Sequence, residues 1–159
     1  MKETLKEAKQ EMKNESRPYT TYSYYLGIPI AFIILFIIGV LEIDIGNTAG
    51  HILFFLTILA HIGASKLKCV SGRKHVAPIL LYAANILSLL LIPLLFMDFT
   101  NGGTGDVYFG FLGLLLIPIQ LVMIIFFFLS ANDIKKAYPT MKEDAKNAQA
   151  NYLMIKKSN

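Results

Sequence analysis

Four long uncharged runs constrain this chain more than any other feature of its sequence. They cover residues 18–41, 45–65, 75–97 and 107–132. A helix rises about 1.5 Å per residue, so each run reaches the roughly 30 Å thickness of the hydrocarbon core of a bilayer. Charged residues make up 16% of the 159 residues, well below the roughly 25% of soluble domains. The sequence therefore predicts an all-α integral membrane bundle of four transmembrane helices.

The predicted transmembrane domain covers residues 22–130. Its helices are expected at about 22–41, 46–66, 76–97 and 107–129. Pro93 should kink the third of these helices, because proline removes a backbone donor and clashes with the preceding turn.

The second predicted helix is polar along one side. At about 100° per residue, its polar side chains fall within an arc of about 120°. They are Asn47, His51, Thr57, His61 and Ser65. Since lipid disfavours such groups, this helix is expected to be the most buried in protein. The first helix has no strongly polar side chain in its middle and is expected to be the most lipid-exposed.

Two charged tails flank the bundle, a leader at 1–21 and a tail at 131–159 with a helix from about 140. In the leader, Met1, Leu5, Ala8 and Met12 form one stripe, which indicates an amphipathic helix that Pro18 ends. A solvated, frayed segment is the alternative. The tail repeats Met141, Ala145, Ala148, Tyr152 and Ile155 at helical spacing. The two stripes would suit antiparallel pairing, within one chain or between two.

The basic residues predict how the chain is oriented. Of 15 Lys and Arg, five precede the first helix, four lie between the second and third, and six follow the fourth. Basic residues in short loops stay cytoplasmic, so both termini are predicted to be cytoplasmic, most simply at the plasma membrane. The basic face suits anionic lipid headgroups better than nucleic acid, which is not an expected partner.

The candidate binding site consists of polar side chains near the predicted bilayer midplane. Thr57, Asn85 and Gln120 lie in the middle of three helices, and His61 lies one turn nearer the cytoplasm. They would either hydrogen-bond between helices, at about 0.6–2 kcal/mol per pair, or form a small-ligand or proton site, since histidine titrates near neutral pH. Gln120 is expected to hydrogen-bond across the bundle or to border a buried water.

Other candidates are weaker. His51, Asp98 and Asp106 are nitrogen and oxygen donors for a metal ion, but their spacing matches no metal loop, and neither a metal nor a cofactor is expected. His75 follows two basic residues and is expected to face water. A single cysteine, Cys69, excludes a disulfide within the chain.

The sequence favours two functions, and a third, an integral membrane enzyme, stays open only because four helices can house one. No Ser-His-Asp order, phosphate loop or HExxH motif favours an enzyme. The first hypothesis is a four-helix membrane protein that binds a membrane partner through its tails, in an accessory, regulatory or immunity-type role. The alternative is a small oligomeric transporter or channel that uses the midplane polar side chains.

Overall fold

The computed structural model describes residues 2–43 and 48–158. Its helices are α1 (Lys2–Val40), α2 (Thr48–Ser65), the short 3₁₀ helix η1 (Gly72–His75), α3 (Val76–Leu90), α4 (Ile92–Thr100), α5 (Asp106–Ala137) and α6 (Met141–Ser158). No strand occurs in these two described ranges. The predicted all-α fold is confirmed.

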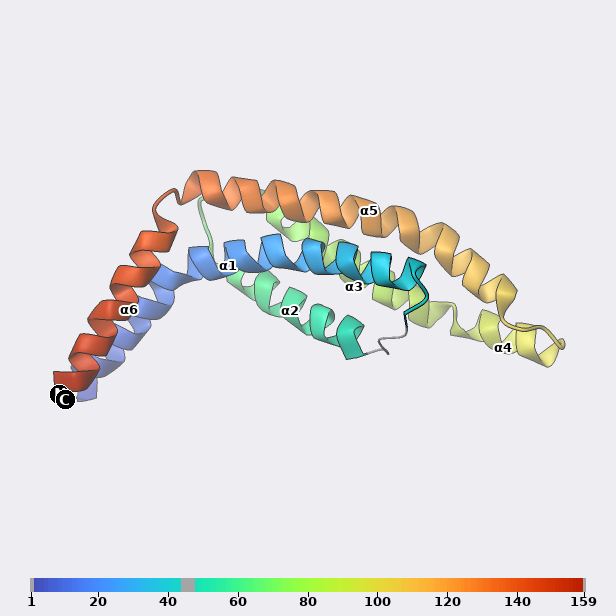
Figure 1. The fold of residues 1–159 in the computed structure, drawn as a ribbon, viewed down its shortest axis with the longest axis horizontal. Coiled ribbons are helices and arrows are strands. Elements are labelled where there is room, and N and C mark those ends of the chain that lie inside the picture. The colour runs from blue at the N-terminus through green and yellow to red at the C-terminus, as the bar shows by residue number, and fades with distance from the viewer. Residues whose placement is uncertain (1, 44–47, 159) are drawn as a thin grey trace.

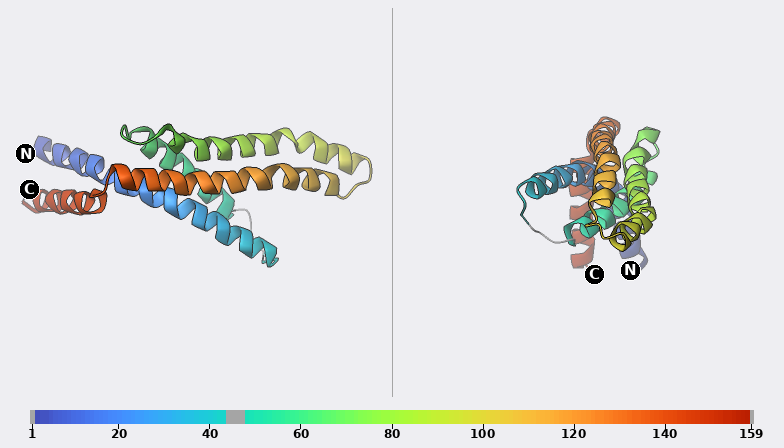
Figure 2. Two further views of the ribbon diagram at one scale, coloured as in Figure 1. Left: turned by 90° about the horizontal axis from the view of Figure 1, so that it is seen from above. Right: turned by 90° about the vertical axis from the view of Figure 1, so that its right-hand side faces the viewer.

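Four helical segments are long and apolar enough to cross a membrane. They are Thr4–Val40, Thr48–Ser65, Gly72–Thr100 and Asp106–Ala137. Each overlaps one of the four uncharged runs, and the uncharged part of the first begins at Pro18. They run beside one another as an elongated bundle, with both termini at the same end (Figures 1 and 2). The predicted start of the second helix at residue 46 and the side chain of Asn47 lie outside the described residues.

The spans differ in how much protein covers them. In an apolar stretch of 18 residues within each span, 22% of the residues are buried in α2, 17% in α1 and 11% in each of the other two spans. The prediction that the second helix is the most buried is confirmed. The prediction that the first is the most lipid-exposed is wrong, because α1 packs against α2, α5 and α6.

Proline 18 does not end the leader helix, and the expectation that it would is wrong. α1 continues through both Pro18 and Pro29 to Val40. A proline inside a helix leaves one carbonyl without its usual donor, which kinks the helix without necessarily ending it. α1 changes direction between its N-terminal part and its apolar part (Figure 1), and Pro18 itself is buried.

The two terminal segments pack against each other. α6 runs alongside the N-terminal part of α1, and together they project from one end of the bundle (Figure 1). Ala8 of α1 and Met141 and Ala145 of α6 are buried. We call residues 2–17 together with α6 the arm. The apolar stripes of the two tails therefore cover each other in part within one chain.

The third span is broken where its proline predicts a kink. α3 ends at Leu90, Leu91 adopts φ −89° and ψ −5°, and α4 begins at Ile92 with Pro93 in its first turn. Proline is tolerated there because the first helical positions have no intrahelical acceptor for their N–H groups. In place of the single helix predicted over 76–97, the structure has two helices, and the second of them ends at Thr100.

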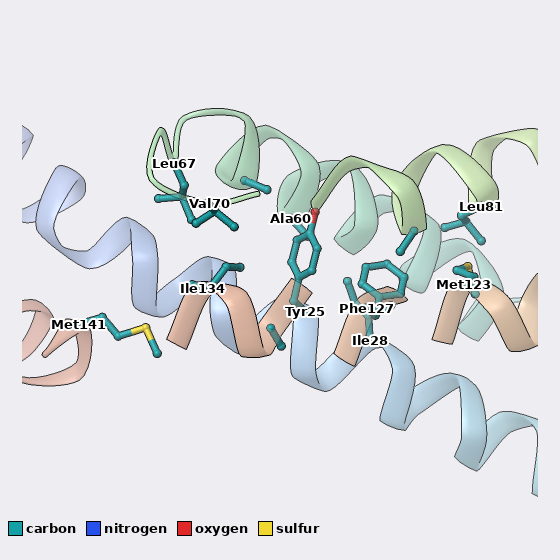
Figure 3. Packing of buried hydrophobic residues seen from close by; sticks show 13 residues of the cluster. Tyr25, Ile28, Ala60, Leu67, Val70, Leu81, Met123, Phe127, Ile134 and Met141 are labelled. Carbon is teal, nitrogen blue, oxygen red and sulfur yellow. The ribbon is translucent and has the colours of Figure 1, made fainter. Parts of the chain in front are cut away.

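The packed core lies toward the end of the bundle that carries both termini. Tyr25 of α1 and Phe127 of α5 are fully buried, with ring centroids 5.2 Å apart and an edge-to-face angle of 71°. Figure 3 shows the two rings next to each other, with Ile28 and Ala60 close by. At the opposite end, α4 has no buried residue. The bundle is therefore tightly packed at one end and loosely packed at the other.

Candidate functional site

Thr57 does not take part in a shared polar site. Its side chain is fully buried, and its hydroxyl donates to the carbonyl of Leu53, 2.9 Å away on the same helix. Such a bond to the preceding turn satisfies the hydroxyl locally. Thr57 thus fills space inside the bundle and brings no free polar group to a ligand.

His61 contacts two side chains from other elements. Its Nδ1 lies 3.2 Å from the hydroxyl of Tyr82 on α3, and its Nε2 lies 2.9 Å from Nδ1 of His75 in η1. The expectation that His75 simply faces water is wrong, since its ring is half-buried against His61. The last turns of α2 thereby meet the start of the third span.

The chemistry of this histidine pair follows from its geometry. A hydrogen bond between two imidazoles needs an N–H on one ring and a lone pair on the other. One proton can therefore move between His61 and His75, while two protonated rings would hold like charges 2.9 Å apart. Tyr82 can donate to Nδ1 of His61 or accept from it, depending on the tautomer.

Asn85 and Gln120 face a common groove between α2, α3 and α5. The groove has a volume of about 600 Å³, and His51 and Ser88 also line it. The amide of Asn85 donates to the carbonyl of Leu81 at 2.8 Å, again within one helix. The carboxamide of Gln120 makes no hydrogen bond to any other residue that the structure describes. The bond expected from Gln120 to the second or third helix is therefore not formed among the described residues.

The four predicted site residues thus occupy three places. Asn85 and Gln120 share the groove, His61 belongs to a cluster with His75 and Tyr82, and Thr57 is satisfied within α2. The rotation of each helix about its own axis separates them.

The weak metal candidates have separate roles. The carboxylate of Asp98 accepts from the backbone N–H of Gly105 at 2.6 Å, and that of Asp106 accepts from the hydroxyl of Thr104. His51 lines the groove near Asn85. In the described ranges, no three His, Cys, Asp or Glu side chains come together in a way that could hold a metal ion. The two aspartates instead shape the connection between α4 and α5.

Sequence reasoning missed the contacts that fix the basic connection between α2 and α3. Lys74 is buried and its ammonium donates to the carbonyl of Leu67, while the hydroxyl of Tyr25 donates to the carbonyl of Lys74. Arg73 forms an ion pair with Asp133 of α5 at 3.2 Å. No spacing pattern marks these residues, because Tyr25 and Asp133 come from distant parts of the chain.

The same end of the bundle includes the start of α6. Burial and the neighbouring thiol of Cys69 raise the pKa of Tyr138, which lies just after α5. Cys69 itself is exposed. The basic connection therefore reaches the junction between the bundle and the arm.

A second groove, of about 420 Å³, lies between the arm and α2. Lys6, Lys9, Lys13 and Arg17 line its arm side, and Leu59 and Gly63 line its α2 side. It combines cationic and apolar side chains in one concave surface.

Comparison with known proteins returned no relative. No protein-family model, curated protein or solved structure matches the chain. The function must therefore be argued from the chain itself.

Proposed function

We propose that this protein acts by binding a membrane partner through its arm, in an accessory, regulatory or immunity-type role. The observation that supports this most directly is the arm itself, a pair of packed helices that extends beyond the uncharged runs (Figure 1). The polar side chains inside the bundle are divided among three places, which weakens the case for one internal reaction centre.

The end of α6 provides an apolar surface for such a partner. Leu153 is 45% exposed and Met154 is 65% exposed. These side chains lie in α6, outside the four segments that are apolar enough to span a membrane, so a spanning position does not account for their exposure. Methionine and leucine at an exposed helix end are suited to contact an apolar surface of another protein.

Site-specific photocrosslinking tests this proposal. A photoreactive residue in place of Met154 should yield one discrete adduct in native membranes, and mass spectrometry should identify the attached chain as another membrane protein. Leu153→Ser should reduce the yield of that adduct several-fold, because it removes an apolar neighbour of the contact without altering a buried residue.

A photoreactive residue in place of Leu114 is the matched control. Leu114 is 73% exposed on α5, within a span, so it should label lipid and not the same partner. An adduct of twice the mass of the chain at position 154 would point to self-association instead. Identical adducts at both positions, or none at 154, would contradict the proposal.

We further propose that both termini are cytoplasmic and that the membrane is the plasma membrane. The distribution of lysine and arginine supports this, because neither of the connections at the opposite end of the bundle has a basic residue. The arm and the histidine pair would then lie on the cytoplasmic side, and His51, Asp98 and Asp106 on the outer side.

Cysteine labelling in intact cells should report this orientation. Asn101→Cys introduces a thiol in the exposed turn after α4, where the backbone has an ordinary negative φ of −89°. The new thiol should react with a membrane-impermeant maleimide, while the exposed native Cys69 should react only after the cells are permeabilised. The reverse pattern would overturn the proposed orientation.

A small oligomeric transporter or channel is the second candidate. It is favoured by one observation, the groove of about 600 Å³ that Asn85 and Gln120 line within the apolar part of the bundle. Gln120→Leu removes the carboxamide from this groove while keeping a similar volume. If ion or proton flux through proteoliposomes is absent, or is unchanged in this variant, the candidate is removed.

A further inference from the structure

One face of α1 in the arm carries four cationic side chains. Lys6, Lys9, Lys13 and Arg17 follow one another at intervals of three, four and four residues. At about 100° per residue these positions fall within an arc of about 80°. All four line the groove of about 420 Å³ between the arm and α2. The regular spacing thus presents a single positive strip to one concave surface.

The charge of this strip is not neutralised by the parts of the protein that the structure describes. The ion pair that the described residues form joins Arg73 to Asp133, and neither residue lines this groove. The guanidinium of Arg17 donates to the amide oxygen of Asn14 at 3.1 Å. Glu11 and Glu15 of the same helix line a different groove, beside α6. The groove beneath the strip therefore has an excess of positive charge.

The opposite wall of the groove is apolar. Leu59 of α2 is 52% exposed and lies next to Gly63 along this wall. Between Leu59 and the end of α2 at Ser65 the helix rises about 9 Å. The arm turns toward the side of the bundle where α2 lies (Figure 1). The groove accordingly leads from a cationic wall outside the uncharged runs to an apolar wall within one of them.

We propose that this groove binds one anionic phospholipid of the surrounding membrane. The phosphate would lie on the strip formed by Lys6, Lys9 and Lys13, and an acyl chain would cover Leu59. Lysines at a membrane surface attract anionic headgroups, and the apolar wall distinguishes a lipid from a soluble anion. This site does not depend on a protein partner, so its test and that of the proposed function can fail separately.

Native mass spectrometry of the full chain, released from nanodiscs of mixed phosphatidylglycerol and phosphatidylcholine, tests the proposal. The wild-type protein should retain one phosphatidylglycerol in preference to phosphatidylcholine. The double substitution Lys9→Gln/Lys13→Gln should lower that preference about thirtyfold, given the attraction of each lysine to an anionic surface. Both residues are exposed, so the variant should unfold at the same temperature as the wild type.

The matched control is Lys142→Gln/Lys146→Gln. These two lysines of α6 are also exposed, and their replacement changes the net charge equally without touching the groove. The control should keep the wild-type preference. An equal loss in both variants would show attraction by net charge alone and would overturn the site, as would unchanged retention in Lys9→Gln/Lys13→Gln.

Competition with inorganic phosphate distinguishes a lipid from a free anion. Millimolar phosphate should leave the retained phosphatidylglycerol in place, because the acyl chain adds contacts that phosphate lacks. Displacement by phosphate would assign the groove to a soluble anion and overturn the lipid assignment. Leu59→Asn, which makes the apolar wall polar, should reduce retention several-fold; unchanged retention in this variant would count against the acyl-chain contact.

Discussion

Phe127→Ala should lower the free energy of unfolding by about 3 kcal/mol, at the lower end of the range for buried phenylalanine. The ring is fully buried between α1 and α5 and contacts the edge of Tyr25. Lipid also surrounds the ring in a membrane-inserted unfolded state, so the loss comes mainly from packing and less from transfer out of water. Unfolding by SDS titration from mild detergent micelles measures the effect.

The control for this substitution is Phe111→Ala on the same helix. Phe111 is 46% exposed within a span, so its loss should change the unfolding free energy by less than about 0.5 kcal/mol. Equal effects of Phe127→Ala and Phe111→Ala would contradict the location of the core.

Tyr25→Phe should cost about 1–3 kcal/mol, because it leaves the buried carbonyl of Lys74 without its donor.

Gly63→Ala should destabilise the wild-type protein yet stabilise the Thr21→Ala variant. A Cβ atom at Gly63 would lie 2.5 Å from the hydroxyl oxygen of Thr21 on α1, whereas the next atom of that side chain, its Cβ, is 3.6 Å away. Overpacking of this kind costs about 1–3 kcal/mol. Against it, alanine is favoured over glycine in a helix by about 1 kcal/mol, and this gain should show once the hydroxyl is gone.

A double-mutant cycle on Gly63 and Thr21 measures this coupling directly. The four proteins should give an interaction energy of about 1–3 kcal/mol. Gly50→Ala is the control in α2, because a Cβ atom there meets nothing within 4 Å, and it should not depend on residue 21. Additive effects of the substitutions at 63 and 21 would mean that α1 and α2 do not approach each other so closely.

The spans were predictable because membrane insertion imposes a simple rule on the sequence. A helix must satisfy its own backbone groups in lipid, and each uncharged run is long enough to do so. The break near Pro93 followed from the same local chemistry. The continuity of α1 through Pro18 could not be predicted in this way. Whether a proline ends a helix or only bends it depends on the neighbours that cover the freed carbonyl.

The grouping of the polar side chains could not be read from the sequence. α5 is apolar on nearly every side, so its pattern does not indicate which way Gln120 points. The contact between His61 and His75 depends on how the connection 66–75 folds back, which Tyr25, Lys74 and Leu67 determine through contacts distant in sequence. The depth of a residue along a helix can be counted from the sequence, whereas the rotation of each helix about its axis is set by packing.

The single helix α1 joins the arm to the bundle without a linker. A flexible linker would let the arm be captured without any effect on the bundle, but here helical backbone runs from Lys2 to Val40 without interruption. α6 packs on the N-terminal part of α1, and Thr21 meets Gly63 further along the same helix. Whatever binds the arm is therefore joined to the contact between α1 and α2 by continuous helical backbone.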